Sequence, residues 1–239
     1  MALVLVPGFM ADKELWAPLA KELEEFGPIV HADISMDDSI PDMARRAIVE
    51  APERFALIGF SLGGYVAREI ARLAPDKVDA LVLVATSSRA DTTDQARRKA
   101  LAASLPAHPF KGVSRSSIEA SLHPSRACDS DLVSRIRAMG VRLGHDAFVR
   151  QSGLIRESDF RRLGEIRCPT LIVAGEQDRI RNLDEALELN IGIRNSTVQI
   201  VRESGHMIPM EKPAKLATLV KSFLHKVLRD ALASYARSS

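Results

Sequence analysis

Cysteine is scarce in this sequence of 239 residues, which contains only Cys128 and Cys168. The two lie 40 residues apart, a separation that is not typical of a metal-binding pair. A single disulfide and two free thiols both fit this count. We favour two free thiols in a reducing compartment.

Long uncharged runs are also missing. The longest, at residues 55–67, has thirteen residues, whereas a membrane-spanning helix needs about 20 apolar residues. The first six residues have neither the basic start nor the cleavable apolar core of a secretory signal. The sequence therefore predicts a cytoplasmic protein without a membrane span.

Neither sign of charge dominates the chain. The 33 Lys and Arg residues against 31 Asp and Glu give a formal net charge of +2, spread along the whole length. No long stripe of one sign is present, so nucleic acid is not an expected partner. A content of 46% hydrophobic and 27% charged residues is typical of globular chains and excludes a disordered or collagen-like one. The length favours one large domain, with room for an insertion.

Short apolar runs alternate with segments of helical periodicity over most of the chain. The first run, at residues 2–6, ends at Pro7-Gly8 and predicts a strand buried on both faces. Helical patterns follow Asp12, Pro41 and Gly64, and a long one spans about Pro213 to Tyr235. The expected strands are residues 2–6, 29–33, 55–58, 78–84, 170–174 and 198–201. Strands separated by helices predict an α/β fold with a doubly wound, mostly parallel sheet of about six strands.

Residues 87–165 break this alternation. They contain four helical patterns, at residues 94–105, 116–122, 131–141 and 147–155, and no convincing buried strand. A block of helices between two strands of an α/β sheet is typical of an inserted cap. We therefore expect a core domain made of residues 1–86 and 166–239 and a helical cap made of residues 87–165.

The stretch Gly59-Phe60-Ser61-Leu62-Gly63-Gly64 stands where the third expected strand passes into a helix. It satisfies G-x-S-x-G, the pattern of a nucleophile on a sharp strand-to-helix turn. Such a turn forces its central residue into strained backbone geometry, and flanking glycines lack the Cβ atoms that would collide there. The pattern predicts that Ser61 is a nucleophile. The structural alternative is that the glycines only let the helix pack closely on the strand, with Ser61 as the helix cap.

The order of further motifs along the chain resembles the α/β-hydrolase family. In that family an Asp or Glu follows a strand after the nucleophile, and a histidine lies in the loop after the next strand. Here the two stretches that follow the last two expected strands are Gly175-Glu176-Gln177-Asp178 and Gly205-His206, the latter continuing to Glu211 and Pro213. The resemblance covers almost the whole chain. It implies that Asp178 and His206 complete a catalytic triad with Ser61.

Both residues have a structural alternative. Asp178 also fits the N-cap of a helix beginning near Arg179, and Glu176 is the competing acid. His206 also fits an ordinary loop histidine, although the other five histidines match no family position. Asp33 ends a strand as well, but it precedes Ser61 in the chain.

The resemblance also implies an oxyanion hole made by the backbone N–H groups of Phe9 and Leu62. Phe9 follows the first strand, where the family usually has His-Gly, and Leu62 follows the nucleophile. Pro7 replaces that histidine, whose side chain commonly helps to hold the loop, and proline also removes an N–H donor. The sheet is further expected to lack the family's first two strands.

The resemblance implies a serine hydrolase that cleaves a small or medium carboxylic ester, thioester or lactone through an acyl-enzyme on Ser61. The expected partner is a small-molecule substrate, and Met10, Phe60 and Met207 are the better candidates for its pocket. No cofactor and no metal are expected, since no helix spacing pairs the three histidines of the cap, His108, His123 and His145. Two alternatives stay open: a ligand receptor with slow turnover, and a cofactor-free perhydrolase or oxygenase. The sequence leaves the oligomeric state undetermined.

Overall fold

The computed structural model describes residues 1–104 and 109–238. Its centre is a six-stranded sheet in the order β2-β1-β3-β4-β5-β6, and every neighbouring pair of strands is parallel. The strands are β1 (Ala2–Val6), β2 (Ile29–His31), β3 (Phe55–Phe60), β4 (Val78–Val84), β5 (Thr170–Gly175) and β6 (Ser196–Val201). The predicted six-stranded parallel sheet is confirmed.

The central strands are apolar because both of their faces are covered. Every residue of β3 and β5 is buried, whereas β6, at the edge of the sheet, is largely exposed. Along β3 the side chains alternate: Ala56 and Ile58 pack with one cluster of buried residues, Phe55 and Leu57 with the other. Truncation of such a fully buried side chain as Leu57 to alanine is expected to destabilise by about 2–5 kcal/mol.

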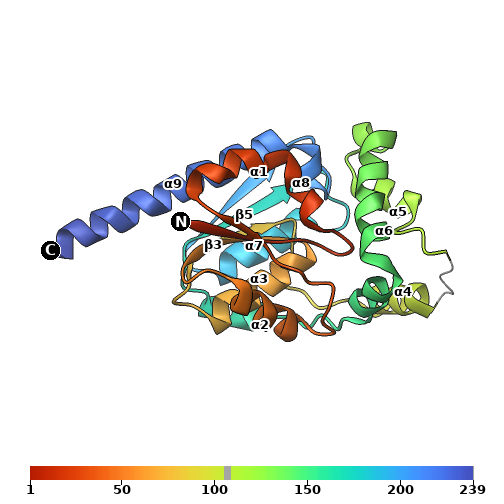
Figure 1. The fold of residues 1–239 in the computed structure, drawn as a ribbon, viewed down its shortest axis with the longest axis horizontal. Helices are drawn as coiled ribbons and strands as arrows, with labels where there is room; N and C mark the ends of the chain where they lie inside the picture. The colour runs from red at the N-terminus through yellow and green to blue at the C-terminus, as the bar shows by residue number, and fades with distance from the viewer. Residues whose placement is uncertain (105–108, 239) are drawn as a thin grey trace.

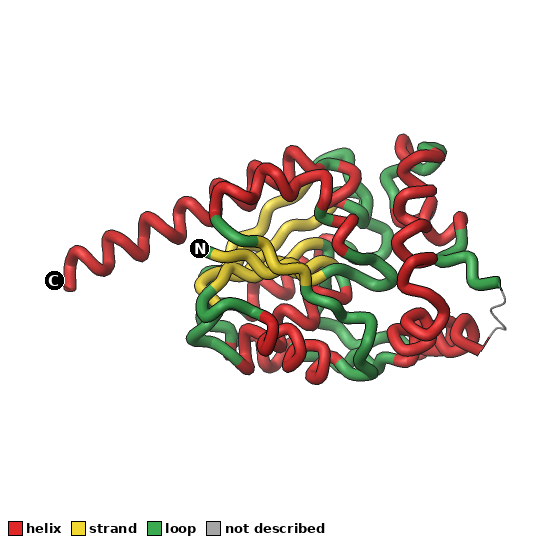
Figure 2. The backbone as a smooth tube through the Cα atoms, in the orientation of Figure 1, coloured by secondary structure: helices red, strands yellow, loops and turns green. Residues whose placement is uncertain are grey.

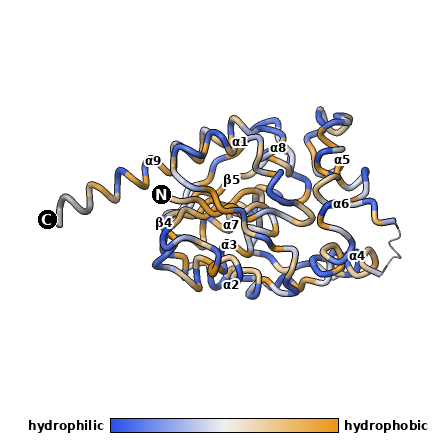
Figure 3. Tube along the Cα trace, in the orientation of Figure 1, coloured by the Kyte–Doolittle hydropathy of each residue, from blue (hydrophilic) through white to orange (hydrophobic). Residues whose placement is uncertain are grey.

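Helices form a layer on each face of this sheet (Figures 1 and 2). Buried residues of α1 and α9 belong to one apolar cluster, and those of α2, α3 and α7 belong to the other, so the sheet is doubly wound as predicted. Figure 3 shows the same division as apolar strands inside and polar outer helix faces. The core helices are α1 (Ala17–Leu23), α2 (Ile40–Glu50), α3 (Leu62–Leu73), α7 (Leu183–Gly192), α8 (Ile208–Glu211) and α9 (Pro213–Ser238), with the short 3-10 helices η1 (Lys13–Leu15) and η2 (Glu24–Phe26).

Local sequence signals set the beginnings of these helices. Asp12 caps η1 by accepting from the N–H of Glu14, and Ser39 caps α2 by accepting from the N–H of Asp42. Asn182 and Glu185 form a reciprocal capping box at the start of α7. The helix expected near Arg179 therefore begins four residues later.

The segment between β4 and β5, which we call the inserted segment, consists of helices joined by loops and contains no strand among its described residues, 87–104 and 109–165. Its elements are α4 (Thr93–Ser104), α5 (Arg115–Ser121), η3 (Pro124–Arg126), α6 (Ser130–Gly153) and η4 (Phe160–Glu165). Two of the expected patterns merge into α6, which bends at Gly144, where φ is 81°. Leu105, the expected end of the first pattern, and His108 lie outside the described residues.

The inserted helices α4, α5 and α6 lie together at one end of the molecule, and α9 projects from the opposite end (Figure 1). The early turns of α9 bury Leu216, Val220 and Leu224 against the sheet, whereas Leu232 is 71% exposed. Among the described residues, no helix has the length and apolarity needed to cross a membrane. Both cysteines are free thiols, as predicted, and burial raises the pKa of the Cys168 thiol to about 11.

Because all six strands are parallel, their carboxyl ends lie at one edge of the sheet, and the loops that follow β1 and β6 there contact the inserted helices. From β1 the chain moves outward to β2, then returns to the other side of β1 as β3. In open α/β sheets, the crevice beside such a reversal is where ligands bind. Phe9 and Ser61 follow the two strands that flank this reversal, β1 and β3.

Candidate active site

Ser61 occupies the turn between β3 and α3, with φ of 51° and ψ of −112°. A residue with a side chain rarely adopts positive φ because its Cβ crowds the backbone, so the surroundings must hold it there. The Ser61 N–H donates to the carbonyl of Val84 at 2.9 Å, and the Thr86 hydroxyl donates to the carbonyl of Ser61 at 2.7 Å. The strained turn that the glycine-flanked motif predicts is present.

Gly59 and Gly63 make this turn sterically feasible. A Cβ on Gly59 would lie 2.4 Å from the carbonyl oxygen of Gly63, and one on Gly63 would lie 2.3 Å from that of Pro7. Backbone atoms cannot move aside as a flexible side chain can, so both positions require glycine. The glycines do allow close packing, but the Ser61 side chain makes no capping hydrogen bond to α3. Its hydroxyl is used elsewhere.

Ser61, His206 and Asp178 form one continuous chain of hydrogen bonds. The Ser61 hydroxyl lies 3.0 Å from Nε2 of His206, and Nδ1 of His206 lies 2.8 Å from Oδ2 of Asp178. A carboxylate only accepts, so Nδ1 carries the hydrogen and Nε2 is left to accept from the hydroxyl. All three residues are buried, at 8% exposure or less. The structure brings together the three residues that the motifs single out.

Asp178 also organises its own turn. Its Oδ1 accepts from the N–H groups of Ile180 and Arg181, at 2.8 and 2.9 Å, which leaves Oδ2 for the imidazole. The alternative acids lie apart: Glu176 is exposed and accepts from the Gln177 amide, and Asp33 accepts from the N–H of Ser35. Neither of these two carboxylates contacts His206.

The two backbone groups expected to form an oxyanion hole belong to adjacent elements. Phe9 lies in the loop after β1, and Leu62 begins α3. Gly8 brings the loop against the turn of Ser61, since a Cβ there would lie 3.3 Å from Cβ of Ser61. Within the described residues, neither the Phe9 nor the Leu62 N–H donates a hydrogen bond. Met10, the next residue in the loop, has a positive φ of 50°.

The inserted segment holds the loop that carries His206, a contact that sequence reasoning missed. The His206 N–H donates to the carbonyl of Ser121, and a carboxylate oxygen of Glu211 accepts from the N–H of His123, both at 2.7 Å. Glu211 belongs to the motif that follows Gly205-His206, so the sequence could have indicated its importance. Ser121 could not have been found from the sequence, because its contact uses a backbone carbonyl, which every residue has.

Aromatic rings lie beside His206 and between the loop after β1 and the inserted segment. The Phe60 ring lies 5.1 Å from the His206 ring, and Phe9 lies 5.8 Å from Phe148, which in turn lies 5.4 Å from Phe110. Phe9 is 38% exposed. By contrast Leu122 and Met139 pack with Met207 in the core cluster, so they serve the fold rather than a separate cavity.

Arg68 of α3 anchors both ends of the inserted segment. Its side chain is fully buried and donates to both carboxylate oxygens of Asp159, at 2.8 and 3.0 Å, and to the carbonyl of Ser87 at 2.7 Å. Burial by itself raises the pKa of Asp159, but the guanidinium groups of Arg68 and Arg72 outweigh it and hold that pKa below its usual value.

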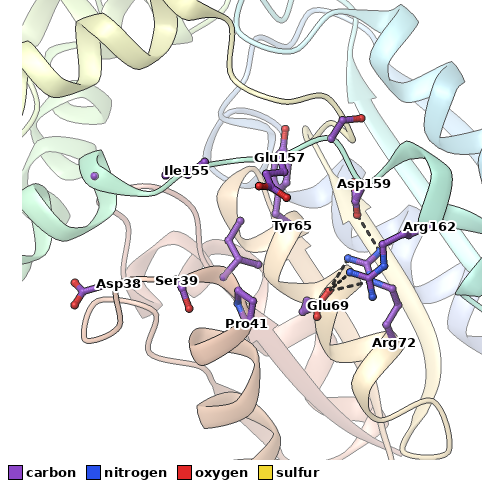
Figure 4. A pocket seen from close by; sticks show the side chains of 13 residues that line it. Asp38, Ser39, Pro41, Tyr65, Glu69, Arg72, Ile155, Glu157, Asp159 and Arg162 are labelled. Carbon is purple, nitrogen blue, oxygen red and sulfur yellow. Dashed lines mark hydrogen bonds and ion pairs between the residues drawn. The ribbon is translucent and has the colours of Figure 1, made fainter.

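A pocket of about 430 Å³ lies beside this anchor, between α2, α3 and residues 153–162 (Figure 4). No residue of the Ser61 hydrogen-bonded chain lines it. Three of its charged side chains form ion pairs with one another, because Arg72 bonds to both Glu69 and Asp159. The pocket is therefore separate from the candidate active site.

The described residues contain no group of three or more His, Cys, Asp or Glu side chains placed to hold a metal ion. Of the histidines in the inserted segment, His123 bonds through Nδ1 to the Ser125 hydroxyl, and His145 packs edge-on against Phe110.

Comparison with known proteins gives two kinds of likeness. A family model described as "Alpha/beta hydrolase family" matches residues 3–219. The monoacylglycerol lipase ABHD6 of Mus musculus is 29% identical over 255 residues, which cover 95% of this chain and 76% of that protein.

Solved structures share the fold. A thermophilic esterase from Thermogutta terrifontis superposes with a TM-score of 0.79 at 22% identity, covering 95% of this chain and 90% of the esterase. The enol-lactonase from Burkholderia xenovorans LB400 superposes with a TM-score of 0.82 at 16% identity, covering 94% of this chain and 91% of the lactonase.

Proposed function

Because the chain belongs to the alpha/beta hydrolase family, we propose that it is a serine hydrolase that cleaves a small or medium carboxylic ester, thioester or lactone. The observation that carries this proposal is the buried chain of hydrogen bonds from the Ser61 hydroxyl through His206 to Asp178. The similar proteins named above, a monoacylglycerol lipase, an esterase and an enol-lactonase, support an acyl substrate.

In the proposed mechanism, Oγ of Ser61 attacks the carbonyl carbon of the substrate while Nε2 of His206 takes the hydroxyl proton. Asp178 keeps the imidazole in the tautomer that can accept and stabilises the imidazolium that forms. The imidazolium then gives its proton to the leaving alcohol or thiol, which produces an acyl-enzyme on Ser61. Water, deprotonated by the same histidine, releases the acid.

The carbonyl oxygen becomes negative in both steps, and the N–H groups of Phe9 and Leu62 are proposed to receive it. Removal of one such donor in a serine protease lowers transition-state stabilisation by roughly 2.7–4 kcal/mol. The Phe9 and Phe148 rings are proposed to meet the apolar part of the substrate, since they join the oxyanion loop to α6.

We further propose that residues 87–165 act as a cap on a core made of residues 1–86 and 166–239. The bonds from Ser121 and His123 to the loop of His206 support this division. A cytoplasmic location stays a prediction from the sequence.

The test is hydrolysis of p-nitrophenyl acyl esters of graded chain length by the intact protein and by Ser61→Ala. We expect turnover by the wild type and a loss of at least about a thousand-fold in the variant. A fluorophosphonate probe followed by peptide mapping should label the peptide that contains Ser61. Wild-type turnover no faster than that of Ser61→Ala would contradict the proposal and favour a ligand receptor.

A further inference from the structure

The loop after β1 has few internal means of holding its shape. Pro7 has no N–H, Gly8 has no side chain, and Phe9 has only an apolar one. One bond within the loop joins the N–H of Ala11 to the carbonyl of Gly8 at 3.2 Å, which makes residues 8–11 a turn with Met10 as its third residue. Met10 has a φ of 50°, a conformation that is costly for a residue with a side chain. The Met10 N–H finds its partner outside the loop.

The partner of the Met10 N–H is the side chain of Gln151, near the end of α6. Its Oε1 accepts from the backbone N–H of Met10 at 2.8 Å, and its Nε2 donates to the carbonyl of Ile34 at 3.2 Å. The side chain is only 2% exposed, so both bonds are shielded from water. The side-chain amide of Gln151 therefore joins the loop after β1 to the segment after β2. Because the Met10 N–H must meet an acceptor and the Ile34 carbonyl a donor, these two bonds also fix the orientation of the amide.

The rest of α6 packs around the same loop. A Cβ on Gly140 would lie 3.6 Å from both the Cβ and the carbonyl oxygen of Met10, an ordinary van der Waals contact. Beyond the loop, Arg142 pairs with Asp12. Of these contacts, only that of Gln151 binds a backbone N–H next to Phe9. It fixes the peptide between Phe9 and Met10. The Phe9 N–H belongs to the preceding peptide, so Gln151 acts on its orientation through the backbone of Phe9.

We propose that Gln151 is a positioning residue that holds the Phe9 N–H in the orientation that receives the oxyanion. This inference rests on the proposed function. It places part of the control of an oxyanion donor in the inserted helices rather than in the sheet. Movement of α6 away from the core breaks the bond to Met10 and releases the loop, so acyl transfer requires α6 in place.

The test compares Gln151→Met with wild type in p-nitrophenyl ester hydrolysis. Methionine keeps the length of the side chain and removes the acceptor for Met10. We expect kcat to fall about 10- to 100-fold with KM within about two-fold, because the oxyanion donor acts in the transition state rather than on bound substrate. Equal kcat in the two proteins would overturn the inference and leave the proposed function standing.

Arg150→Met is the matched control. Arg150 is the neighbour of Gln151 on α6, and its Nε donates to the carbonyl of Ser35 at 2.9 Å, one residue from the Ile34 contact, without touching Met10. Its kcat should stay within about two-fold of wild type. An equal fall in both variants would overturn the inference, since general loosening of α6 would then explain it. Absence of turnover in wild type, with Ser61 unlabelled, would instead overturn the proposed function and this role with it.

Gln151→Glu keeps the inference testable if the methionine variant fails to fold. The neutral acid accepts from Met10 through its carbonyl and donates to Ile34 through its hydroxyl, whereas the ionised form only accepts. Both forms keep the acceptor for Met10, and the ionised form loses only the donor that anchors the side chain on Ile34. The kcat of Gln151→Glu should therefore match wild type within about two-fold at low pH, where both bonds are kept, and fall by less than about ten-fold as pH rises. A ratio to wild type below about one tenth at low pH in the folded variant would overturn the inference.

Discussion

The turn that carries Ser61 and the two loops that face it are held in different ways. Ser61 is constrained by the strands and helix that flank it, through Val84, Thr86 and the glycines at 59 and 63. Met10 and His206 are instead bonded to Gln151 and Ser121 of the inserted segment. Substitutions in the Ser61 turn should therefore destabilise the fold, whereas substitutions at the contacts of the inserted segment should lower the proposed activity first.

The largest effect is expected from Gly63→Ala, a substitution in the turn that the strands and α3 hold. The added Cβ would lie 2.3 Å from the carbonyl oxygens of Val6 and Pro7, and β1 is too well packed to move. We expect a loss of about 3 kcal/mol or more in the free energy of unfolding, with loss of ester turnover. Urea unfolding measures it, with Gly164→Ala as control because that Cβ meets nothing within 4 Å. An unfolding midpoint equal to that of wild type would contradict the steric argument.

Asp159→Asn tests the buried ion pair between Arg68 of α3 and Asp159, near the end of the inserted segment. It leaves the fully buried Arg68 without its carboxylate, and we expect a loss of about 2–4 kcal/mol at neutral pH. Because the folded-state pKa of Asp159 is lowered, its contribution is present above the ordinary Asp value of about 4 and is lost as pH falls through the lowered one. The difference from wild type should therefore shrink below about pH 4.

Thermal or urea unfolding from pH 7 to pH 2 measures this difference. Glu165→Gln is the control, since its pair with Arg162 is 51% exposed on both sides and should contribute under about 1 kcal/mol. A difference that grows toward low pH would show that the assigned sign is wrong.

Gly205→Ala tests the contact between the inserted segment and the loop that carries His206. The new Cβ would lie 2.5 Å from the backbone nitrogen of His123 and 2.7 Å from the carbonyl oxygen of Ser121, the acceptor of the His206 N–H. The facing backbone at Ser121 and Leu122 is buried but lies outside the sheet, so we expect about a ten-fold fall in kcat/KM and a stability loss of about 1–3 kcal/mol. Gly153→Ala, where a Cβ meets nothing within 4 Å, should match wild type. Undiminished kcat/KM in Gly205→Ala would show that the histidine loop does not depend on this contact.

Arg142→Met should have the smallest effect and sharpen the role given to Gln151. Both residues join α6 to the chain after β1, but the pair of Arg142 with Asp12 is on the surface, with the Arg142 side chain 48% exposed. We expect a stability change under about 1 kcal/mol and unchanged ester kinetics. A fall in kcat as large as that of Gln151→Met would assign the effect to α6 packing as a whole.

The sequence was a good guide wherever the signal was local. Continuous apolar runs gave the strands to within a few residues, because strands covered on both faces contain few polar residues. The motif around Ser61 predicted a strained turn, since the need for glycine at 59 and 63 arises from neighbouring backbone. Asp178 and His206 were found by their order after successive strands, which parallel topology brings to one edge.

The contacts of Gln151, Ser121 and Arg68 could not be found in this way. Each joins segments far apart in the chain, and all three involve backbone atoms, which every residue possesses. The merging of two helical patterns into a bent α6 likewise depends on Gly144 and on packing against the core.

By itself, then, the sequence determined a parallel α/β sheet, a glycine-bounded serine turn and the identity of the two residues that form a hydrogen-bonded chain with Ser61. Only the tertiary structure decided which distant groups hold the loops that carry Phe9 and His206. Periodicity and motifs report what a residue requires of its chain neighbours, whereas a hydrogen bond between Met10 and Gln151 exists only after the sheet and the inserted helices have packed together.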